Sequence, residues 1–341
     1  IFTANTSPTV YRGDQFPAEY QGNVFLGEVA GRIIRRSVFT EQDGLITARN
    51  AYDQREFLFS RDERFRPVYT ADGPDGALYV ADMYRGLIEG HLFITTYLRN
   101  QIIERGLQEA MVGKGRIYRI AHKERPRGQP PAVARNDAAG WVPVLAHANG
   151  FWRDTAQRLI IESGDRRVVP ALQRMVREHA QELGRLHALW TLEGLRAVTP
   201  ELVKSALRDA SPQVRVAALR VAEPMLAQDE VAASVLALAG DSRIEVRRQL
   251  MLSLGEVRGE RFEQAMAALL ARDAAQPIVV EAALSGLRDR ELTFFRRLWS
   301  DAKWQTAEQA SAAKVFAALS HAVVMTDRVD DLEALITAAG N

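Results

Sequence analysis

Two different spacings of hydrophobic residues divide the sequence. Up to about residue 124, apolar residues come in short runs bounded by turn residues, which is typical of β-strands. From residue 141 to the end they recur every three or four positions, which is typical of amphipathic helices. Residues 125–140 between them are rich in proline and charge and indicate a linker. The pattern therefore predicts a β domain at 1–124 followed by a helical domain at 141–341.

Two β-hairpins are expected in the first part. Residues 23–29 and 32–36 are β-rich runs on either side of Ala30 and Gly31. Residues 66–71 and 77–82 flank a Pro-Asp-Gly turn in the same way.

The two hairpin regions resemble each other residue by residue. Residues 22–28 align with 76–82, and 31–35 align with 115–119, so the second copy carries an insert. Apolar residues recur at helical spacing within 87–112, so a helix is expected there. Repeated antiparallel sheets of this kind are typical of β-propeller blades, of which a closed ring needs about four to eight.

About two blades are present here, so we expect the missing propeller blades in upstream sequence or in another chain. The alternative is a small independent β-sheet or sandwich, which would not require the two copies to match.

The helical part repeats with a period of about 32 residues. Arginines are spaced by 32, 30 and 32 residues, and a small or apolar residue follows each by three positions; the arginines are Arg153, Arg185, Arg215 and Arg247. An aspartate stands six residues before each of the later positions, namely Asp209, Asp241 and Asp273, the last preceding Val279. Helix–turn–helix units of this length must stack to bury their apolar faces, which predicts an α-solenoid of HEAT-like repeats. We expect the Asp and Arg side chains to bond across the inter-helix turn or to the next repeat.

Composition excludes several classes of function. The chain has 44 basic and 43 acidic residues, and this net charge of +1 argues against nucleic-acid binding. It has no cysteine, which excludes disulfides, thiolate catalysis and a covalently attached c-type haem. No apolar run approaches the length of about 20 residues that a membrane span needs.

Several segments resemble one protein family. The stretch GPDGALYVADMYRG (73–86), together with YRGD (11–14), FRPV (65–68) and GRIYRI (115–120), is similar to bacterial membrane-bound dehydrogenase-like proteins. In that family a six-bladed propeller similar to PQQ sugar and sorbosone dehydrogenases is followed by HEAT repeats, often with a cytochrome c module. The resemblance implies PQQ and Ca²⁺ as cofactors of the intact propeller, and a periplasmic or secreted location.

The resemblance also suggests candidate site residues. Asp82, Tyr84 and Arg85 stand at or just after the end of a strand, where they could hold a carboxylate-bearing cofactor. His91 is the candidate general base for hydride abstraction from an alcohol. The structural alternative is that Asp82 caps the turn and Arg85 pairs with it. No histidine shows metal-ligand spacing, so no metal site is predicted from the residues themselves.

Two further features receive structural interpretations. Gly73–Gly76 lacks the alternating acidic residues of a calcium loop and is expected to be a plain β-turn. Aromatic residues near the first helices are expected to cap the end of the helical array; they are Trp141, Phe151, Trp152 and Trp190.

The sequence leaves two functions open. In the first, the chain is the C-terminal part of a PQQ-type sugar or alcohol dehydrogenase, inactive alone, whose solenoid docks a protein partner or an electron-accepting cytochrome c. In the second, propeller and solenoid form a non-enzymatic interaction scaffold. A lyase-like or chaperone role of the helical repeats would rest on analogy of fold alone.

Overall fold

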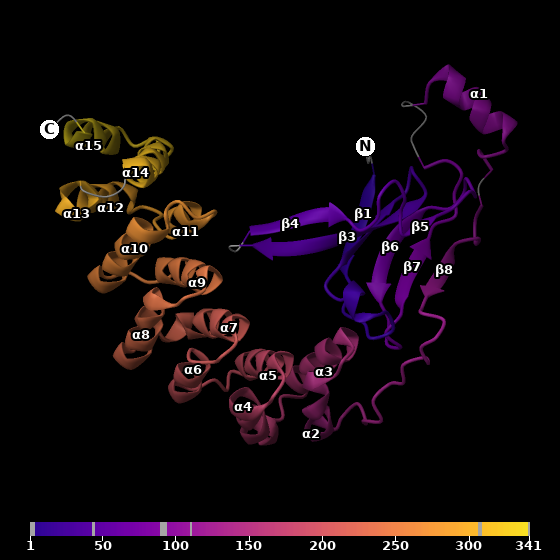
Figure 1. Ribbon diagram of the computed structural model, residues 1–341, viewed down its shortest axis with the longest axis horizontal. Coiled ribbons are helices and arrows are strands. Elements are labelled where there is room, and N and C mark those ends of the chain that lie inside the picture. Colours follow the sequence, from indigo (N-terminus) through magenta and orange to yellow (C-terminus); the bar gives the residue numbers. More distant parts are fainter. Residues whose placement is uncertain (1–3, 43–44, 89–93, 110, 306–308, 340–341) are drawn as a thin grey trace. The chain divides into compact units, whose positions relative to one another are not determined.

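A computed structural model describes residues 4–42, 45–88, 94–109, 111–305 and 309–339 (Figure 1). The chain forms antiparallel sheets followed by many helices, so the predicted β-then-α class is confirmed. It divides into two compact units, one formed almost entirely by residues up to Ser163 and the other by residues from Gly164 onwards.

Strands β1 to β8 build two sheets in the first unit. Their bounds are β1 Asn5–Val10, β2 Val24–Glu28, β3 Ile33–Gln42, β4 Leu45–Asn50, β5 Leu58–Phe59, β6 Pro67–Asp72, β7 Leu78–Asp82 and β8 Arg116–Ile120. One sheet has the order β1-β2-β3-β4, with β5 beside β3, and the other has the order β6-β7-β8. Neither sheet closes into a barrel within the described residues.

Both predicted hairpins are confirmed. Strand β2 pairs antiparallel with β3 and β6 with β7, while β8 joins β7 across the insert. The insert contains helix α1 (Thr96–Glu104), whose first turn is capped by the Thr95 side chain. Each sheet thus contains a meander of three consecutive strands, β1-β2-β3 in the five-stranded sheet and β6-β7-β8 in the three-stranded sheet, which is the structural counterpart of the sequence repeat.

The first strands of the two meanders lie against each other. The Thr6 hydroxyl donates to the Pro67 carbonyl at 2.8 Å, and the Thr9 hydroxyl donates to the Thr70 carbonyl at 2.6 Å. The core beside them is contributed by both sheets and consists of Tyr11, Phe16, Phe25, Ile34, Leu78 and Val80.

Tyr11 is the polar centre of this core. Its hydroxyl donates to the Gly76 carbonyl at 2.6 Å and accepts from the main-chain N–H groups of Gln15 at 3.0 Å and Phe16 at 2.9 Å. Burial raises the pKa of the Tyr11 hydroxyl to about 12, even though the two N–H groups favour the phenolate. One side chain therefore fixes the segment after β1 to the turn before β7.

No helix or strand lies between Ile120 and Ala138, in the region of the expected linker. The first helices then follow, with bounds α2 Ala138–Trp141, η3 Pro143–Ala146 and α3 Gly150–Ser163. Although the sequence pattern groups them with the later helices, they belong to the same compact unit as the sheets.

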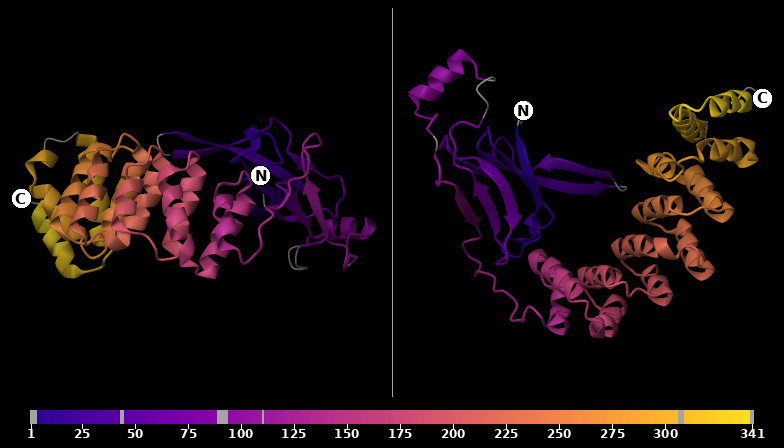
Figure 2. Two further views of the ribbon diagram at one scale, coloured as in Figure 1. Left: turned by 90° about the horizontal axis from the view of Figure 1, so that it is seen from below. Right: turned by 180° about the vertical axis from the view of Figure 1, so that it is seen from behind.

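The second unit consists of helices. The main ones are α4 Val169–Glu178, α5 Glu182–Gly194, α6 Pro200–Ala206, α7 Pro212–Ala222, α8 Asp229–Leu236, α9 Ile244–Gly255, α10 Glu260–Asp273, α11 Val279–Ser285, α12 Glu291–Ser300, α13 Ala302–Gln305, α14 Gln309–Val324 and α15 Val329–Ala339. Helices α5, α7, α9 and α11 contact one another in succession, and we call them the front row. Helices α4, α6 and α8 also contact one another in succession and form a second row beside it (Figure 2).

The helices of the front row approach one another closely where side chains are small. Ala188 and Ala218 are fully buried at equivalent positions of α5 and α7. Further along, a Cβ on Gly255 would lie 2.5 Å from the Cα of Gly286, so only glycine allows this contact.

Three of the four repeated arginines bond to the aspartate of the next repeat, which confirms the predicted Asp–Arg bonds for these three. The fourth, Arg153, instead donates to the main-chain carbonyls of His147 at 2.6 Å and Ala148 at 2.9 Å. Arg185 holds Asp209 by two hydrogen bonds of 2.7 and 2.8 Å. Arg215 holds Asp241 at 2.8 and 3.0 Å in the same way. The third pair, Arg247 with Asp273, has distances of 2.7 and 2.9 Å. We call these three pairs the rungs.

The arginine of each rung also donates to a main-chain carbonyl in the turn before the helix that carries it. Arg215 donates to the Asp209 carbonyl at 2.7 Å, and Arg247 donates to the Asp241 carbonyl at 2.8 Å. Burial raises the pKa of the Asp241 carboxyl, but hydrogen bonds from Arg215 and from a main-chain N–H outweigh it, so the net shift is downward. Asp241 therefore stays charged. Asp209 and Asp241 each connect two successive arginines, one through the carboxylate and one through the main-chain carbonyl.

Substitution of Tyr11 by Phe tests the polar centre of the β core. The Gly76 carbonyl and two N–H groups lose their partner, so Tyr11→Phe is expected to lower the free energy of unfolding by about 1–3 kcal/mol. The folded state favours the neutral phenol, so its contribution is complete below pH 10 and is lost as pH rises toward 12. Urea unfolding between pH 8 and 12 measures both effects.

The matched control for Tyr11→Phe is Tyr69→Phe, since Tyr69 is 58% exposed. Equal stability of the two variants at neutral pH would contradict the role given to the Tyr11 hydroxyl.

Candidate functional site

The candidate cofactor residues lie at the end of β7. Asp82 is the last residue of this strand and is only 3% exposed. Its Oδ1 accepts hydrogen bonds from the main-chain N–H groups of Arg66 at 2.7 Å and Tyr84 at 2.8 Å. Its Oδ2 is buried without a hydrogen-bond partner. Asp82 therefore caps the turn after β7, as the structural alternative predicted.

Tyr84 and Arg85 do not converge with Asp82 on a common point. Tyr84 has a φ of 52°, and the guanidinium of Arg116 lies over its ring at 3.5 Å. Arg85 is exposed, and its carbonyl accepts from the Arg66 guanidinium at 2.8 Å. No ion pair joins the side chains of Arg85 and Asp82, both of which lie in the described part of the chain, so that predicted pair is wrong. His91 lies outside the described residues.

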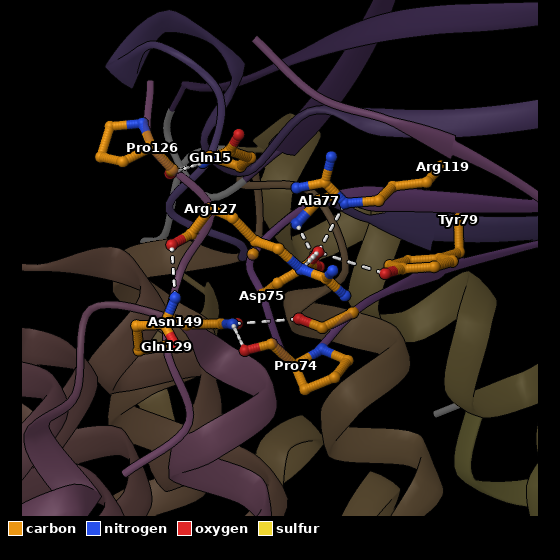
Figure 3. A network of polar contacts seen from close by, with 12 residues as sticks. Gln15, Pro74, Asp75, Ala77, Tyr79, Arg119, Pro126, Arg127, Gln129 and Asn149 are labelled. Atoms are coloured by element: carbon orange, nitrogen blue, oxygen red, sulfur yellow. Dashed lines mark hydrogen bonds and ion pairs between the residues drawn. The ribbon is translucent and has the colours of Figure 1, made fainter. Parts of the chain in front are cut away.

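A buried carboxylate in the preceding turn has far more partners. Asp75 is 3% exposed, and its Oδ2 accepts from Arg119 at 2.5 Å, Arg127 at 3.0 Å and the Tyr79 hydroxyl at 3.2 Å (Figure 3). Its Oδ1 accepts from the main-chain N–H of Ala77 at 3.3 Å. Burial raises the pKa of the Asp75 carboxyl, but the bond from Arg119 and the other donors outweigh it, so the net shift is downward.

The same turn holds the segment before α2 and the start of α3. The Gly128 N–H donates to the Asp75 carbonyl at 3.3 Å. From α3, Trp152 Nε1 donates to the Pro74 carbonyl at 2.7 Å. From the residue before α3, Asn149 Nδ2 donates to the Gly73 carbonyl at 3.0 Å and to the Pro74 carbonyl at 3.3 Å (Figure 3). We call Asp75 and these partners the turn clasp. It joins β7, β8, the irregular segment and α3 at one point.

The aromatic residues divide between two places. Trp141 stacks with Trp152 at 6.3 Å between ring centroids, and Phe151 meets Trp152 edge-on at 5.1 Å. Trp190 instead lies against the Arg220 guanidinium, at 5.4 Å from the ring centroid, on the front row of the helical unit. The expectation of one aromatic cluster therefore holds for the first three residues, whereas Trp190 has a different environment.

The sequence indicated the turn at Gly73–Gly76 but missed the role of Asp75. The turn is confirmed by the Gly76 N–H bond to the Gly73 carbonyl at 3.0 Å and by a φ of 78° at Gly76. Arg119 and Arg127 follow Asp75 by 44 and 52 residues, and no periodic pattern connects them. The only local feature of the sequence that could have indicated this role is an aspartate directly before the glycine of a turn.

The described residues include neither a candidate metal site nor a candidate membrane-spanning helix. They contain no group of three or more His, Asp or Glu side chains that could hold a metal ion. None of the helices in them has the length and apolarity required to cross a bilayer.

The β part of the chain matches the model of a known protein family. Residues 1–124 match the model of a domain of unknown function, DUF7133, which covers strands β1 to β8. A search of curated proteins gave no match. The chain is thus similar to that family over its sheets, and the comparison assigns no activity.

Substitution of Asp75 by Asn tests the turn clasp. Asn keeps the shape but loses the charge, so the bonds from Arg119 and Arg127 weaken, and a loss of about 1.5–3 kcal/mol in the free energy of unfolding is expected. Trypsin should then cut faster after Arg127. Because the pKa of Asp75 is lowered in the folded state, wild type should lose this stabilisation as pH falls through and below the ordinary carboxyl pKa of 3.8.

Asp53→Asn serves as the matched control, since Asp53 is exposed and has no bonded partner within the described residues. If Asp75→Asn resisted trypsin and urea to the same extent as Asp53→Asn, the result would contradict the stabilising role given to the turn clasp.

Proposed function

We propose that this chain is an interaction scaffold in which blades of a β-propeller are attached to an α-solenoid of HEAT-like repeats, and that the solenoid docks a protein partner. The two three-stranded meanders support the first part. Strands β1 and β6 meet through threonine hydroxyls, as first strands of neighbouring blades would around a propeller axis. Further blades would then come from other sequence, and a periplasmic or secreted setting is the corresponding location.

The rungs support the second part of the proposal. They connect successive repeats in one direction, so each helix pair is fixed to the next by a buried ion pair with two hydrogen bonds. A stack of this kind presents equivalent positions of successive helices in a row, which is how solenoids form extended binding surfaces.

The observation that carries the docking role is one such row on α5, α7 and α9. Trp190, Arg220 and Leu252 each follow a rung arginine by five residues. Arg220 is exposed and lies over the Trp190 ring, while Leu252 is 39% exposed. Tryptophan and arginine are the residue types most enriched among the energetically dominant residues of protein interfaces. This row is therefore the centre of the proposed docking surface.

The dehydrogenase alternative is favoured by a single observation, the buried and unpartnered Oδ2 of Asp82 at the end of a strand. The residues present do not fit PQQ as a group, because Asp82 is used by the turn and Arg85 is not directed to it by any bond. Asp82 and Arg85 by themselves would therefore not hold the cofactor, and contacts from other blades would be required.

The docking surface is tested by capture of partners from the source cells. The chain carrying Arg220→Ala and Leu252→Asp is expected to bind its partner at least about thirtyfold more weakly, because loss of a dominant interface residue costs about 2 kcal/mol or more. Arg174→Ala on α4, an exposed arginine of the other row, is the matched control. Equal binding of the double variant and the control would contradict the proposed row.

Activity separates the scaffold from the dehydrogenase. The intact protein, with the further blades that the dehydrogenase would require, is mixed with PQQ and Ca²⁺ and is expected to reduce no artificial electron acceptor with sugars or alcohols as substrates. Reduction that disappears in Asp82→Asn but not in Asp53→Asn would overturn the scaffold proposal and support the enzyme.

A further inference from the structure

A pocket of about 250 Å³ lies in the first unit between α1, the β2–β3 turn and the segment after β7. Its walls are mainly apolar. Apolar side chains come from three segments far apart in the sequence, and they are Ala30, Leu87, Ile88, Leu98, Ile102 and Leu107. The remaining wall carries three arginines and one carboxylate, Arg32, Arg66, Arg105 and Glu63. An apolar pocket with a few charged groups is the usual form of a small-molecule site.

Arg66 is fixed in position at this pocket. Its guanidinium donates to the carbonyls of Arg85 at 2.8 Å, Val29 at 2.8 Å and Gly86 at 2.6 Å. A guanidinium carries more N–H groups than these carbonyls accept, so donors remain for a ligand. Burial and the nearby charge of Arg32 both lower the pKa of Arg66, which means that its cation lacks solvation and is repelled by a second cation.

Three carboxylates of this region, Glu63, Asp82 and Glu28, already have partners among the described residues. Glu63 forms an ion pair with Arg105 at 2.6 Å. Asp82 and Glu28 are each 3% exposed, do not line the pocket, and accept from main-chain N–H groups. Arg32 also lines the pocket, and its side chain makes no hydrogen bond or ion pair with any described residue. The pocket wall therefore has an excess of positive charge.

The geometry points to a binding site for a short aliphatic carboxylate, with its carboxylate on Arg32 and Arg66 and its chain against α1. A carboxylate fits the planar donor pattern of arginine. The apolar walls favour an alkyl chain over a hydrated anion such as phosphate, because removal of apolar surface from water adds to affinity. The small volume limits the ligand to a short chain. The site is independent of the docking surface on the helical unit.

Titration of the whole chain with hexanoate, followed by NMR or calorimetry, tests this site. Saturable binding is expected, and Arg32→Gln should weaken it at least tenfold, whereas Arg32→Lys should weaken it less. Leu98→Asp places a negative charge in the apolar wall at a residue that is 39% exposed, and should weaken binding without unfolding the chain. Arg99→Gln is the matched control, since Arg99 is exposed on α1 and does not line the pocket.

Titration of the chain with inorganic phosphate is the second part of the experiment. Binding of phosphate as tight as that of hexanoate would overturn the assigned ligand class. Absence of saturable hexanoate binding, or binding that survives both Arg32→Gln and Leu98→Asp, would overturn the site itself.

Discussion

The helical unit depends on carboxylates that are shared between successive repeats. Asp209 and Asp241 each accept two hydrogen bonds from the arginine of the preceding repeat, and through their carbonyls each holds the arginine of its own repeat. Because these groups are largely buried, removal of one partner leaves a charge without compensation, which costs far more than an exposed pair contributes. This requirement fixes the spacing of the helix pairs, and with it the row of side chains that we assign to docking.

The β unit uses the same principle at a single point. Asp75 gathers two arginines and a tyrosine from strands and an irregular segment, while the Tyr11 hydroxyl links the neighbouring turn to the segment after β1. Both polar centres converge on the turn at Gly73–Gly76. The sheets, the irregular segment and helix α3 thus form one compact unit, although the hydrophobic pattern places α3 with the later helices.

How much of this the sequence predicts depends on whether the interaction recurs. The rungs were predictable because Arg and Asp repeat with a fixed period, and so were the hairpins, which are local. The Asp75 centre was not, since its partners are distant in sequence and occur once. For Asp82, sequence reasoning named both the turn cap, which is confirmed, and an Arg85 pair, which is wrong: Oδ1 accepts from main-chain N–H groups, and Oδ2 has no hydrogen-bond partner. The role of His91 stays a prediction.

The most direct test of the account is a double-mutant cycle on one rung. Arg215→Met, Asp241→Asn and their combination would be compared with wild type by urea unfolding of the chain. We predict that each single change costs about 2–4 kcal/mol and that the double variant loses at least about 1 kcal/mol less than the sum, since its members interact directly. Costs that add to within about 0.5 kcal/mol would contradict the claim that the rungs hold the repeats together.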